Sequence, residues 1–433
     1  MKKTIISLLL AIYAVAIAAQ VGKWSGELDI QGMKIPLVFN FTKDGCTLDS
    51  PSQGAKGIKA IFYNTPDETL KVDIGMINAV FEGKMTANEI AGSFTQNGYS
   101  FPLTLRQNVT SPYRPQTPKG PFSYTTEDVI FQNGEFTFQG TLTLPKNYNK
   151  DTPVLVMVTG SGQQNRDEEL MGHRPFAVIA DSLANNGIAT MRFDDRGWED
   201  KNFPWQNYTI ADHKSDAMAG VSLMRKRFNH VGVIGHSEGG TIALMMASEG
   251  KVDFCISLAG MFVSGKQTII EQNYNILLNS GLPESTVDTY CDNLEKACDD
   301  VIANKNIEDN ECLNVPEALR QNFKASLKQL STRYMRDFLC VDIRETLPNI
   351  KCPVLALNGK SDAQVNYSAN LDVLEKGLTS CKHEIIAFDG LNHLFQHCQT
   401  GFVNEYYIIE ETIAPEILQV MTDWIKKTVS HIE

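Results

Sequence analysis

The sequence predicts an α/β protein: a mostly parallel sheet covered by helices on both faces, preceded by a small all-β barrel or sandwich. From about residue 122 onward, short apolar strands alternate with helical patterns, which is typical of parallel sheets. Before residue 107, seven short segments of alternating apolar and polar residues follow one another at even spacing. Residues 262–350 interrupt the later alternation with a mostly helical stretch, which predicts a helical cap inserted into the sheet domain.

The N-terminus has the three parts of a signal peptide. Lys2 and Lys3 precede an apolar run at 5–18, and the run ends in Ala-Ile-Ala. This run is shorter than the roughly 20 residues that a membrane-spanning helix needs. We therefore expect residues 1–19 to be removed, leaving a periplasmic or secreted protein without a membrane anchor.

Composition narrows the function classes. The chain has 433 residues and a net charge of −12, and it contains no Lys/Arg cluster of the kind that binds nucleic acid. The nine cysteines are an odd number without metal-ligand spacing. We expect no metal, no nucleic-acid partner and no disulfide framework.

Residues 20–107 form the predicted all-β accessory domain. Its segments contain no catalytic set, so a folded accessory module is the simplest interpretation; glycan binding, shielding of an active site and dimerisation remain open. A proline-rich linker follows at 108–121. The seven predicted strands are 24–30, 35–41, 60–63, 70–74, 79–82, 90–94 and 101–105.

Residues 122–433 form the predicted catalytic domain. An antiparallel hairpin at 124–131 and 136–144 precedes the alternating part. The remaining strands are predicted at 154–158, 188–193, 231–236, 254–258, 353–357 and 384–388. Helices are predicted at 175–186, 210–228, 238–249, 368–378 and 415–432.

The chemistry is indicated by Gly-His-Ser-Glu-Gly at 235–239, a Gly-x-Ser-x-Gly motif between a β-branched strand and a good helix former. In such a strand-to-helix turn the serine adopts a strained backbone conformation, and its neighbouring glycines allow close packing. Ser237 is therefore the predicted nucleophile. Because it precedes a helix, the positive end of the helix dipole would favour an oxyanion beside it.

A serine nucleophile needs a histidine base and a carboxylate that orients it. His393 follows the last predicted strand and is preferred over His397, one turn further on. Asp362 follows the strand at 353–357 and is preferred over Asp389, which lies only four residues before the base. Ser237, Asp362 and His393 each come off the carboxyl end of a strand.

The oxyanion hole needs two backbone N–H groups. The amide of Glu238, directly after the nucleophile, is one candidate. The other lies in the glycine-rich loop Thr-Gly-Ser-Gly-Gln-Gln at 159–164, where Ser161 is preferred and Gly162 is next. A phosphate-binding loop is disfavoured because no Gly-Lys-Ser/Thr ending and no Gly-x-Gly-x-x-Gly is present.

From residue 122 onward the chain resembles the α/β-hydrolase superfamily, in particular bacterial esterases close to the prolyl oligopeptidase-like and serine aminopeptidase-like enzymes. The resemblance rests on the segments 159–168, 173–176, 192–197, 235–240, 357–365 and 390–395. It implies ester hydrolysis through an acyl-enzyme, with Ser237, Asp362 and His393 as nucleophile, acid and base, and it implies that no cofactor is needed. The chain departs from these relatives after Gly197, where Trp-Glu-Asp-Lys replaces Gly-x-Gly-x-Ser.

The expected function is that of an exported serine esterase acting on a small-molecule ester, with a small or medium acyl group and carbohydrate-linked esters among the candidates. The first alternative is a serine peptidase or aminopeptidase-like amide hydrolase, since the same triad cleaves amides. A non-catalytic glycan- or ligand-binding protein is the alternative of another class.

Overall fold

The structure is a computed structural model that describes residues 22–30, 33–42, 45–65, 69–86, 89–107, 114–200, 202–307 and 315–431. The predicted signal peptide at 1–19 and Cys312 lie outside these residues. The described chain forms two compact units: residues before 114 together with 403–410, and residues 114–402 together with those from 411 onward. Each unit is described by itself.

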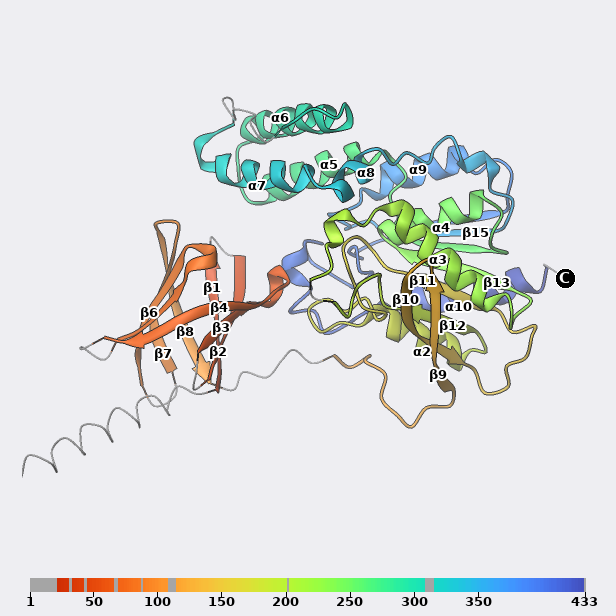
Figure 1. Ribbon diagram of the computed structural model, residues 1–433, viewed down its shortest axis with the longest axis horizontal. Coiled ribbons are helices and arrows are strands. Elements are labelled where there is room, and N and C mark those ends of the chain that lie inside the picture. Colours follow the sequence, from red (N-terminus) through yellow and green to blue (C-terminus); the bar gives the residue numbers. More distant parts are fainter. Residues whose placement is uncertain are drawn as a thin grey trace, which may run out of the picture. The chain divides into compact units, whose positions relative to one another are not determined.

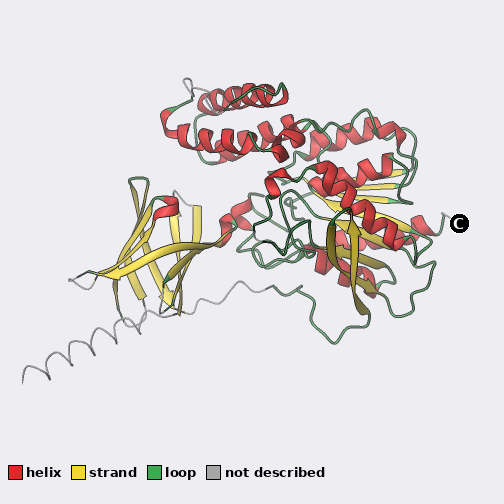
Figure 2. Cartoon of the chain, viewed as in Figure 1, coloured by secondary structure: helices red, strands yellow, loops and turns green. Residues whose placement is uncertain are grey.

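The first unit is a closed antiparallel barrel of eight strands in sequence order (Figure 2). β8 closes it by pairing with β1, where Trp24 lies opposite Gln107. Alternate side chains point inward and form an apolar interior that includes Trp24, Phe39 and Phe81. The strands are β1 (Gly22–Ile30), β2 (Met33–Phe41), β3 (Cys46–Ser50), β4 (Ala55–Asn64), β5 (Thr69–Ile74), β6 (Ala79–Met85), β7 (Glu89–Gln96) and β8 (Tyr99–Gln107).

Two features of the barrel differ from the sequence prediction. An eighth strand, β3, is present between the first two predicted strands and the third. Its pairing with β4 shifts register between Leu48 and Ser50, and it ends in the short helix η1 (Pro51–Gln53), so its alternation is too brief to recognise. The unit also contains η6 (Val403–Glu405), which packs against η1 and β2 although the intervening chain belongs to the second unit.

The second unit contains a sheet of eight strands in the order β16-β15-β14-β13-β11-β12-β10-β9 (Figure 1). The strands from β11 to β16 are parallel to their neighbours, whereas the hairpin β9/β10 is antiparallel and joins the sheet through β12. The bounds are β9 (Thr125–Asn133), β10 (Phe136–Leu144), β11 (Val154–Val158), β12 (Ala189–Phe193), β13 (Val231–His236), β14 (Cys255–Leu258), β15 (Val354–Gly359) and β16 (His383–Phe388).

Helices cover both faces of this sheet. Residues of α3, α4 and α9 belong to one apolar cluster, and residues of α2 and α10 belong to another, with the sheet between them. The predicted α/β class with a preceding all-β unit is thus confirmed, and of the two forms left open for that unit, barrel and sandwich, the structure has the barrel. The helices are α2 (Pro175–Asn185), α3 (Ile210–Met224), α4 (Glu238–Ser248), α9 (Tyr367–Gly377) and α10 (Pro415–Val429).

The cap lies between β14 and β15, within the stretch predicted for it. Its helices bury one face each around residues such as Tyr290, Leu294 and Phe323. They are α5 (Gly265–Asn279), α6 (Glu284–Ile302), α7 (Arg320–Leu330) and α8 (Arg333–Leu339). None of the helices in the described part of the chain has the length and apolar character to cross a membrane. The eight cysteines in that part are free thiols.

The sheet topology fixes where a site can form. β11 lies between β12 and β13, so the chain leaves β11 toward one side of the sheet and later continues on the other. Ligands of such sheets bind at the carboxyl ends of the strands where this reversal occurs. Val158, the last residue of β11, is paired with Gly235 of β13, so the loop after β11 and Ser237 emerge side by side.

Candidate active site

Ser237 occupies the turn between β13 and α4 in a strained conformation. Its φ is 55° and its ψ is −121°, values that a non-glycine residue adopts only when its surroundings impose them. Close packing explains the flanking glycines: a Cβ at Gly235 would lie 2.0 Å from the carbonyl oxygen of Gly239, and one at Gly239 would lie 2.1 Å from that of Val158. The turn therefore has the form predicted for a nucleophile elbow.

Asp362 and His393 are joined by a buried hydrogen bond. His393 Nδ1 lies 2.7 Å from Asp362 Oδ2. The other carboxylate oxygen accepts hydrogen bonds from the amides of Gln364 and Val365, at 2.8 and 2.9 Å, which fixes its orientation. With Nδ1–H donated to the carboxylate, Nε2 of His393 carries a lone pair and can accept a proton.

The two rival residues lie at the surface. Asp389 has a side chain that is 89% exposed and pairs with Lys360 at 2.9 Å. His397 is also exposed and contacts Glu411 and Glu416, at 2.9 and 3.3 Å. In the described structure, neither Asp389 nor His397 forms an ion pair with the other predicted site residues. The structure thus brings together the preferred pair and leaves the rivals in separate ion pairs.

His236, the residue before the nucleophile, connects the elbow to the base. Its Nδ1 lies 3.0 Å from Glu168 Oε1, and its Nε2 lies 2.9 Å from the carbonyl oxygen of His393. The rings of His236 and His393 are 4.7 Å apart. Burial lowers the pKa of His236, but Glu168 and the His393 carbonyl outweigh it and raise the pKa above its usual value. Both ring nitrogens face acceptors, so the protonated form of His236 can donate to both at once, and the side chain links Glu168 to the loop that carries the base.

Three groups in the loop after β11 donate hydrogen bonds to carboxylates, and these bonds hold the loop in place. The amide of Gly160 donates to Glu168 at 2.7 Å. Asp195 accepts hydrogen bonds from the Thr159 hydroxyl at 2.8 Å and from the Gln164 amide at 2.7 Å. The loop tip, which carries the predicted donor Ser161, lies between these anchors. The other predicted donor, the Glu238 amide, is in the first turn of α4, where amides have no intrahelical partner.

Behind the elbow lies a buried ionisable network that was not identified from the sequence. His213 of α3 lies 3.6 Å from Asp195 and 3.5 Å from the side chain of Glu238. Burial raises the pKa of Asp195 to about 7, against the effect of His213. The pKa of His213 is also raised: burial opposes the shift, but Glu238 and Asp195 exceed it. Asp195 lies in the segment 192–197, one of those on which the family resemblance rests, and this was the only sequence feature that pointed to the network.

Other polar residues near the loop have structural partners. Asp194 forms an ion pair with Arg166, and Asp167 forms one with Arg192. His173 Nδ1 lies 2.9 Å from the hydroxyl of Thr412. Glu168, by contrast, bonds to the loop at 159–164, through the Gly160 amide. No group of His, Cys, Asp and Glu side chains in the described ranges could hold a metal ion.

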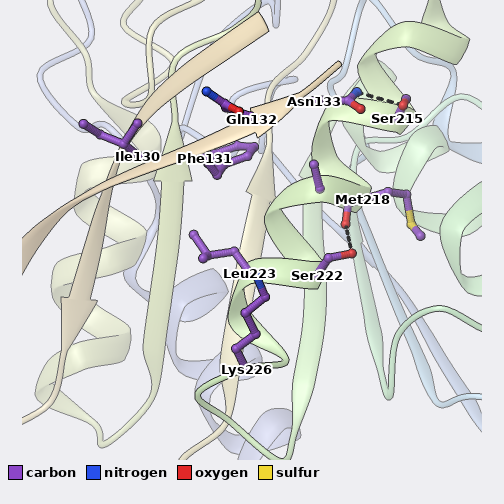
Figure 3. A pocket seen from close by; sticks show the side chains of 10 residues that line it. Ile130, Phe131, Gln132, Asn133, Ser215, Met218, Ser222, Leu223 and Lys226 are labelled. Atoms are coloured by element: carbon purple, nitrogen blue, oxygen red, sulfur yellow. Dashed lines mark hydrogen bonds between the residues drawn. The ribbon is translucent and has the colours of Figure 1, made fainter. Parts of the chain in front are cut away.

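A groove of about 650 Å³ lies between the edge strand β9 and helix α3 (Figure 3). Asn133 donates a hydrogen bond to Ser215 across it, at 2.8 Å. Lys226 is its only ionisable lining residue, and none of the predicted site residues lines it. The groove therefore offers no group for acyl transfer and is separate from the elbow.

Comparisons with known proteins agree with the fold. Residues 173–397, just over half of the chain, match the family described as serine aminopeptidase, S33. Esterase EstD of Thermotoga maritima is 25% identical over 373 residues, covering 84% of this chain and 80% of the relative.

Solved structures with a similar fold include Est1E from Butyrivibrio proteoclasticus. Its sequence is 15% identical, the match covers 70% of this chain and 99% of the Est1E chain, and the TM-score is 0.42. Proline iminopeptidase of Mycobacterium smegmatis has 15% identity, coverage of 71% and 100%, and a TM-score of 0.46. At these values neither structure bears on the substrate.

Proposed function

Because this chain belongs to the serine aminopeptidase S33 family and has the α/β-hydrolase fold, it is a hydrolase, and we propose that it is an exported serine esterase. Its substrates are carboxyl esters with small or medium acyl groups, including carbohydrate-linked esters. The observation that carries the proposal is the buried 2.7 Å bond between Asp362 and His393, held by His236 beside the strained Ser237.

In this mechanism Ser237 Oγ attacks the ester carbonyl carbon while His393 Nε2 takes the hydroxyl proton. The amides of Ser161 and Glu238 stabilise the negative charge that develops on the carbonyl oxygen. The carbon–oxygen bond to the alcohol breaks, the alcohol takes the proton from His393, and an acyl-enzyme remains. Water then attacks the acyl carbon and gives a proton to His393. The bond between the acyl carbon and Ser237 Oγ breaks, Oγ takes that proton from His393, and the acid leaves. Asp362 stabilises the imidazolium in both halves.

We prefer ester cleavage over aminopeptidase action because the carboxylates around the elbow are bound to groups of the protein itself. An aminopeptidase binds the ammonium group of its substrate through an anionic side chain. Glu168 faces His236, Asp195 faces Thr159 and Gln164, and Glu238 is buried beside His213. Oε1 of Glu168, both carboxylate oxygens of Asp195 and the Glu238 carboxylate are thus directed toward internal partners. The 25% identical relative, named an esterase, supports the same choice.

Labelling with a fluorophosphonate probe tests the nucleophile. We expect the wild-type chain to be labelled, Ser237→Ala to be unlabelled, and Ser222→Ala, a matched control in the groove of Figure 3, to be labelled normally. Absence of wild-type labelling and of turnover would reject the serine hydrolase and favour a binding protein.

Substrate preference separates the two hydrolase classes. We expect p-nitrophenyl esters of short and medium acids to be turned over with a higher kcat/KM than aminoacyl anilides. A preference for the anilides would assign the same triad to a peptidase. Export is tested separately, by the N-terminus of the mature protein, which we expect near residue 20.

A further inference from the structure

A buried histidine of α3 lies behind the elbow, with its two ring nitrogens turned toward two different segments. His213 is 1% exposed, and its Nδ1 lies 3.5 Å from Glu238 Oε1, at the start of α4. Its Nε2 lies 3.6 Å from Asp195 Oδ1, in the loop after β12, and 3.4 Å from the Thr159 hydroxyl. His213, Asp195 and Glu238 form the His213 cluster, which stands between the elbow and the loop at 159–164.

Each carboxylate of the cluster belongs to a segment that carries one of the proposed oxyanion amides. Asp195 accepts hydrogen bonds from the Thr159 hydroxyl and the Gln164 amide, at 2.8 and 2.7 Å, and so holds the loop on both sides of Ser161. Glu238 provides the other amide from its own backbone. The distance between the two carboxylates therefore bears on how the two amides converge.

The protonated form of the His213 ring fits both contacts. A neutral imidazole has one N–H and one lone pair, so it would turn the lone pair toward one carboxylate, whereas the imidazolium donates toward both. Asp195 and Glu238 are buried, and buried charges of one sign repel strongly unless a cation compensates them. Burial lowers the pKa of His213, but Glu238 and Asp195 outweigh it and raise the pKa above its usual value.

No other positive charge pairs with the cluster. In the part of the chain that the structure describes, His213 is the only basic side chain within ion-pair distance of either carboxylate. Arg196, which follows the cluster's aspartate in the chain, pairs instead with Asp216 of α3 at 2.7 Å. Tyr334 of α8 donates a hydrogen bond to the Glu238 carboxylate, but its hydroxyl brings no charge. Compensation of the two carboxylates therefore depends on the imidazole.

We propose that His213 is a positioning residue for acyl transfer: as an imidazolium between Asp195 and Glu238, it holds the elbow beside the loop at 159–164 and offsets the negative charge behind the oxyanion hole. The inference rests on the proposed function. Oxyanion donors act only when they are aimed at the developing charge, and an uncompensated carboxylate nearby opposes that charge. Without the positive ring, the two carboxylates would repel, or Asp195 would take a proton and lose an acceptor for the loop.

The test is His213→Gln in the full chain, because glutamine keeps hydrogen-bonding groups but carries no charge. We expect this variant to lower kcat for p-nitrophenyl acetate by about 10- to 100-fold, less than the loss of a direct oxyanion donor, with KM changed by less than about threefold. A kcat within about twofold of the wild type, or a rise in KM alone, would overturn the proposal.

Tyr208→Phe is the matched control. The buried Tyr208 ring contacts that of His213, with centroids 5.6 Å apart, and its hydroxyl donates to Asp216 at 3.3 Å. The change thus removes a buried hydrogen bond beside the same imidazole and leaves the charges of the cluster as they are. Both kinetic constants should stay within about twofold of the wild type. A loss equal to that of His213→Gln would show that any disturbance at this depth lowers kcat, and would overturn the proposal.

A second substitution separates the charge of His213 from its packing. Glu238→Gln keeps the backbone amide and removes one carboxylate, so the double variant no longer buries two carboxylates without a cation. We expect kcat of His213→Gln/Glu238→Gln to be at least about threefold higher than that of His213→Gln, since a charge imbalance is relieved whereas a packing defect is not. If His213→Gln does not fold, the second substitution should restore folding for the same reason.

Two outcomes of this comparison would reject the proposal: a double variant that is no more active than His213→Gln, or failure of both variants to fold. The proposed function fails separately, if the wild-type chain is neither labelled by a fluorophosphonate nor active on esters.

Discussion

The interiors of the two units differ in kind. In the described part of the barrel the buried side chains are apolar except for Ser50 and Ser52. Near the carboxyl ends of the strands of the second unit, ionisable groups are buried together, namely Glu168, Asp194, Asp195, His213, Asp216, His236, Glu238, Asp362 and His393. Both units are closed around large apolar cores, so the polar groups of the second are not required to form a stable interior.

This difference indicates where the chain accepts a cost in stability in order to position the groups of the site. Burying an ionisable group costs free energy unless it is paired and hydrogen-bonded, and such groups therefore concentrate where a site needs them. In the second unit they tie the base loop through His236 and fix the loop at 159–164, on either side of the strained Ser237 turn. The described residues of the barrel contain no comparable set.

The largest effect is expected from the carboxylate of the proposed triad. Asp362→Asn should lower kcat/KM by about 10³- to 10⁴-fold, because the amide cannot stabilise the imidazolium and favours the wrong tautomer of His393. Steady-state hydrolysis of p-nitrophenyl esters measures this loss. Asp389→Asn is the matched control, since its exposed carboxylate pairs with Lys360, and its activity should stay within about twofold. Equal losses in the two variants would remove the assignment of the acid to Asp362.

The next largest effect is expected in the barrel, and it concerns the stability of the fold and not the rate of hydrolysis. Trp24 is fully buried, so Trp24→Ala should destabilise the barrel by about 3–5 kcal/mol. Hydrogen exchange of the barrel strands in the full chain should report this loss, while kcat stays within about twofold. Tyr99→Ala, at a position that is 71% exposed, is the control and should change little. A fall in kcat of tenfold or more in Trp24→Ala would show that the barrel takes part in the chemistry.

The smallest effect is a dependence of stability on pH that belongs to the second unit. His236 has a raised pKa in the folded chain, so its stabilising contribution is complete below its unfolded pKa, near 6.5, and is lost as the pH rises through the folded value. Raising the pH from 6 to 9 should therefore lower Tm by about 2–4 °C.

Two comparisons sharpen this last prediction. Glu168→Gln removes the charge that raises the pKa of His236, so the variant should be less stable at pH 6 and should lose less on going to pH 9. In the described barrel, burial raises the pKa of Cys46 to about 12, and the Glu82 carboxylate raises that of Lys71, so neither group titrates in this range. Barrel amides, corrected for intrinsic exchange, should show no pH effect; an effect there would contradict the contrast between the units.

Much of this architecture could be read from local sequence patterns. The elbow at 231–240 was predictable because its strand, its strained turn and its glycines are contiguous, and their requirements are local. Asp362 and His393 were preferred over Asp389 and His397 by their positions relative to strand ends, because parallel strands end at a common edge of the sheet. The apolar alternation of residues 22–107 predicted a β unit, but left open whether it forms a barrel or a sandwich.

The tertiary structure decided what depends on distant contacts. The pairing of β1 with β8 closes the barrel, and 403–410 joins that unit through packing that no local pattern records. No sequence pattern singled out Tyr334, and only the fold shows that its hydroxyl donates a hydrogen bond to the Glu238 carboxylate. By itself the sequence determined the elements and the residue types capable of chemistry. Which buried charges face one another was set by folding, because electrostatic pairing depends on distance in space.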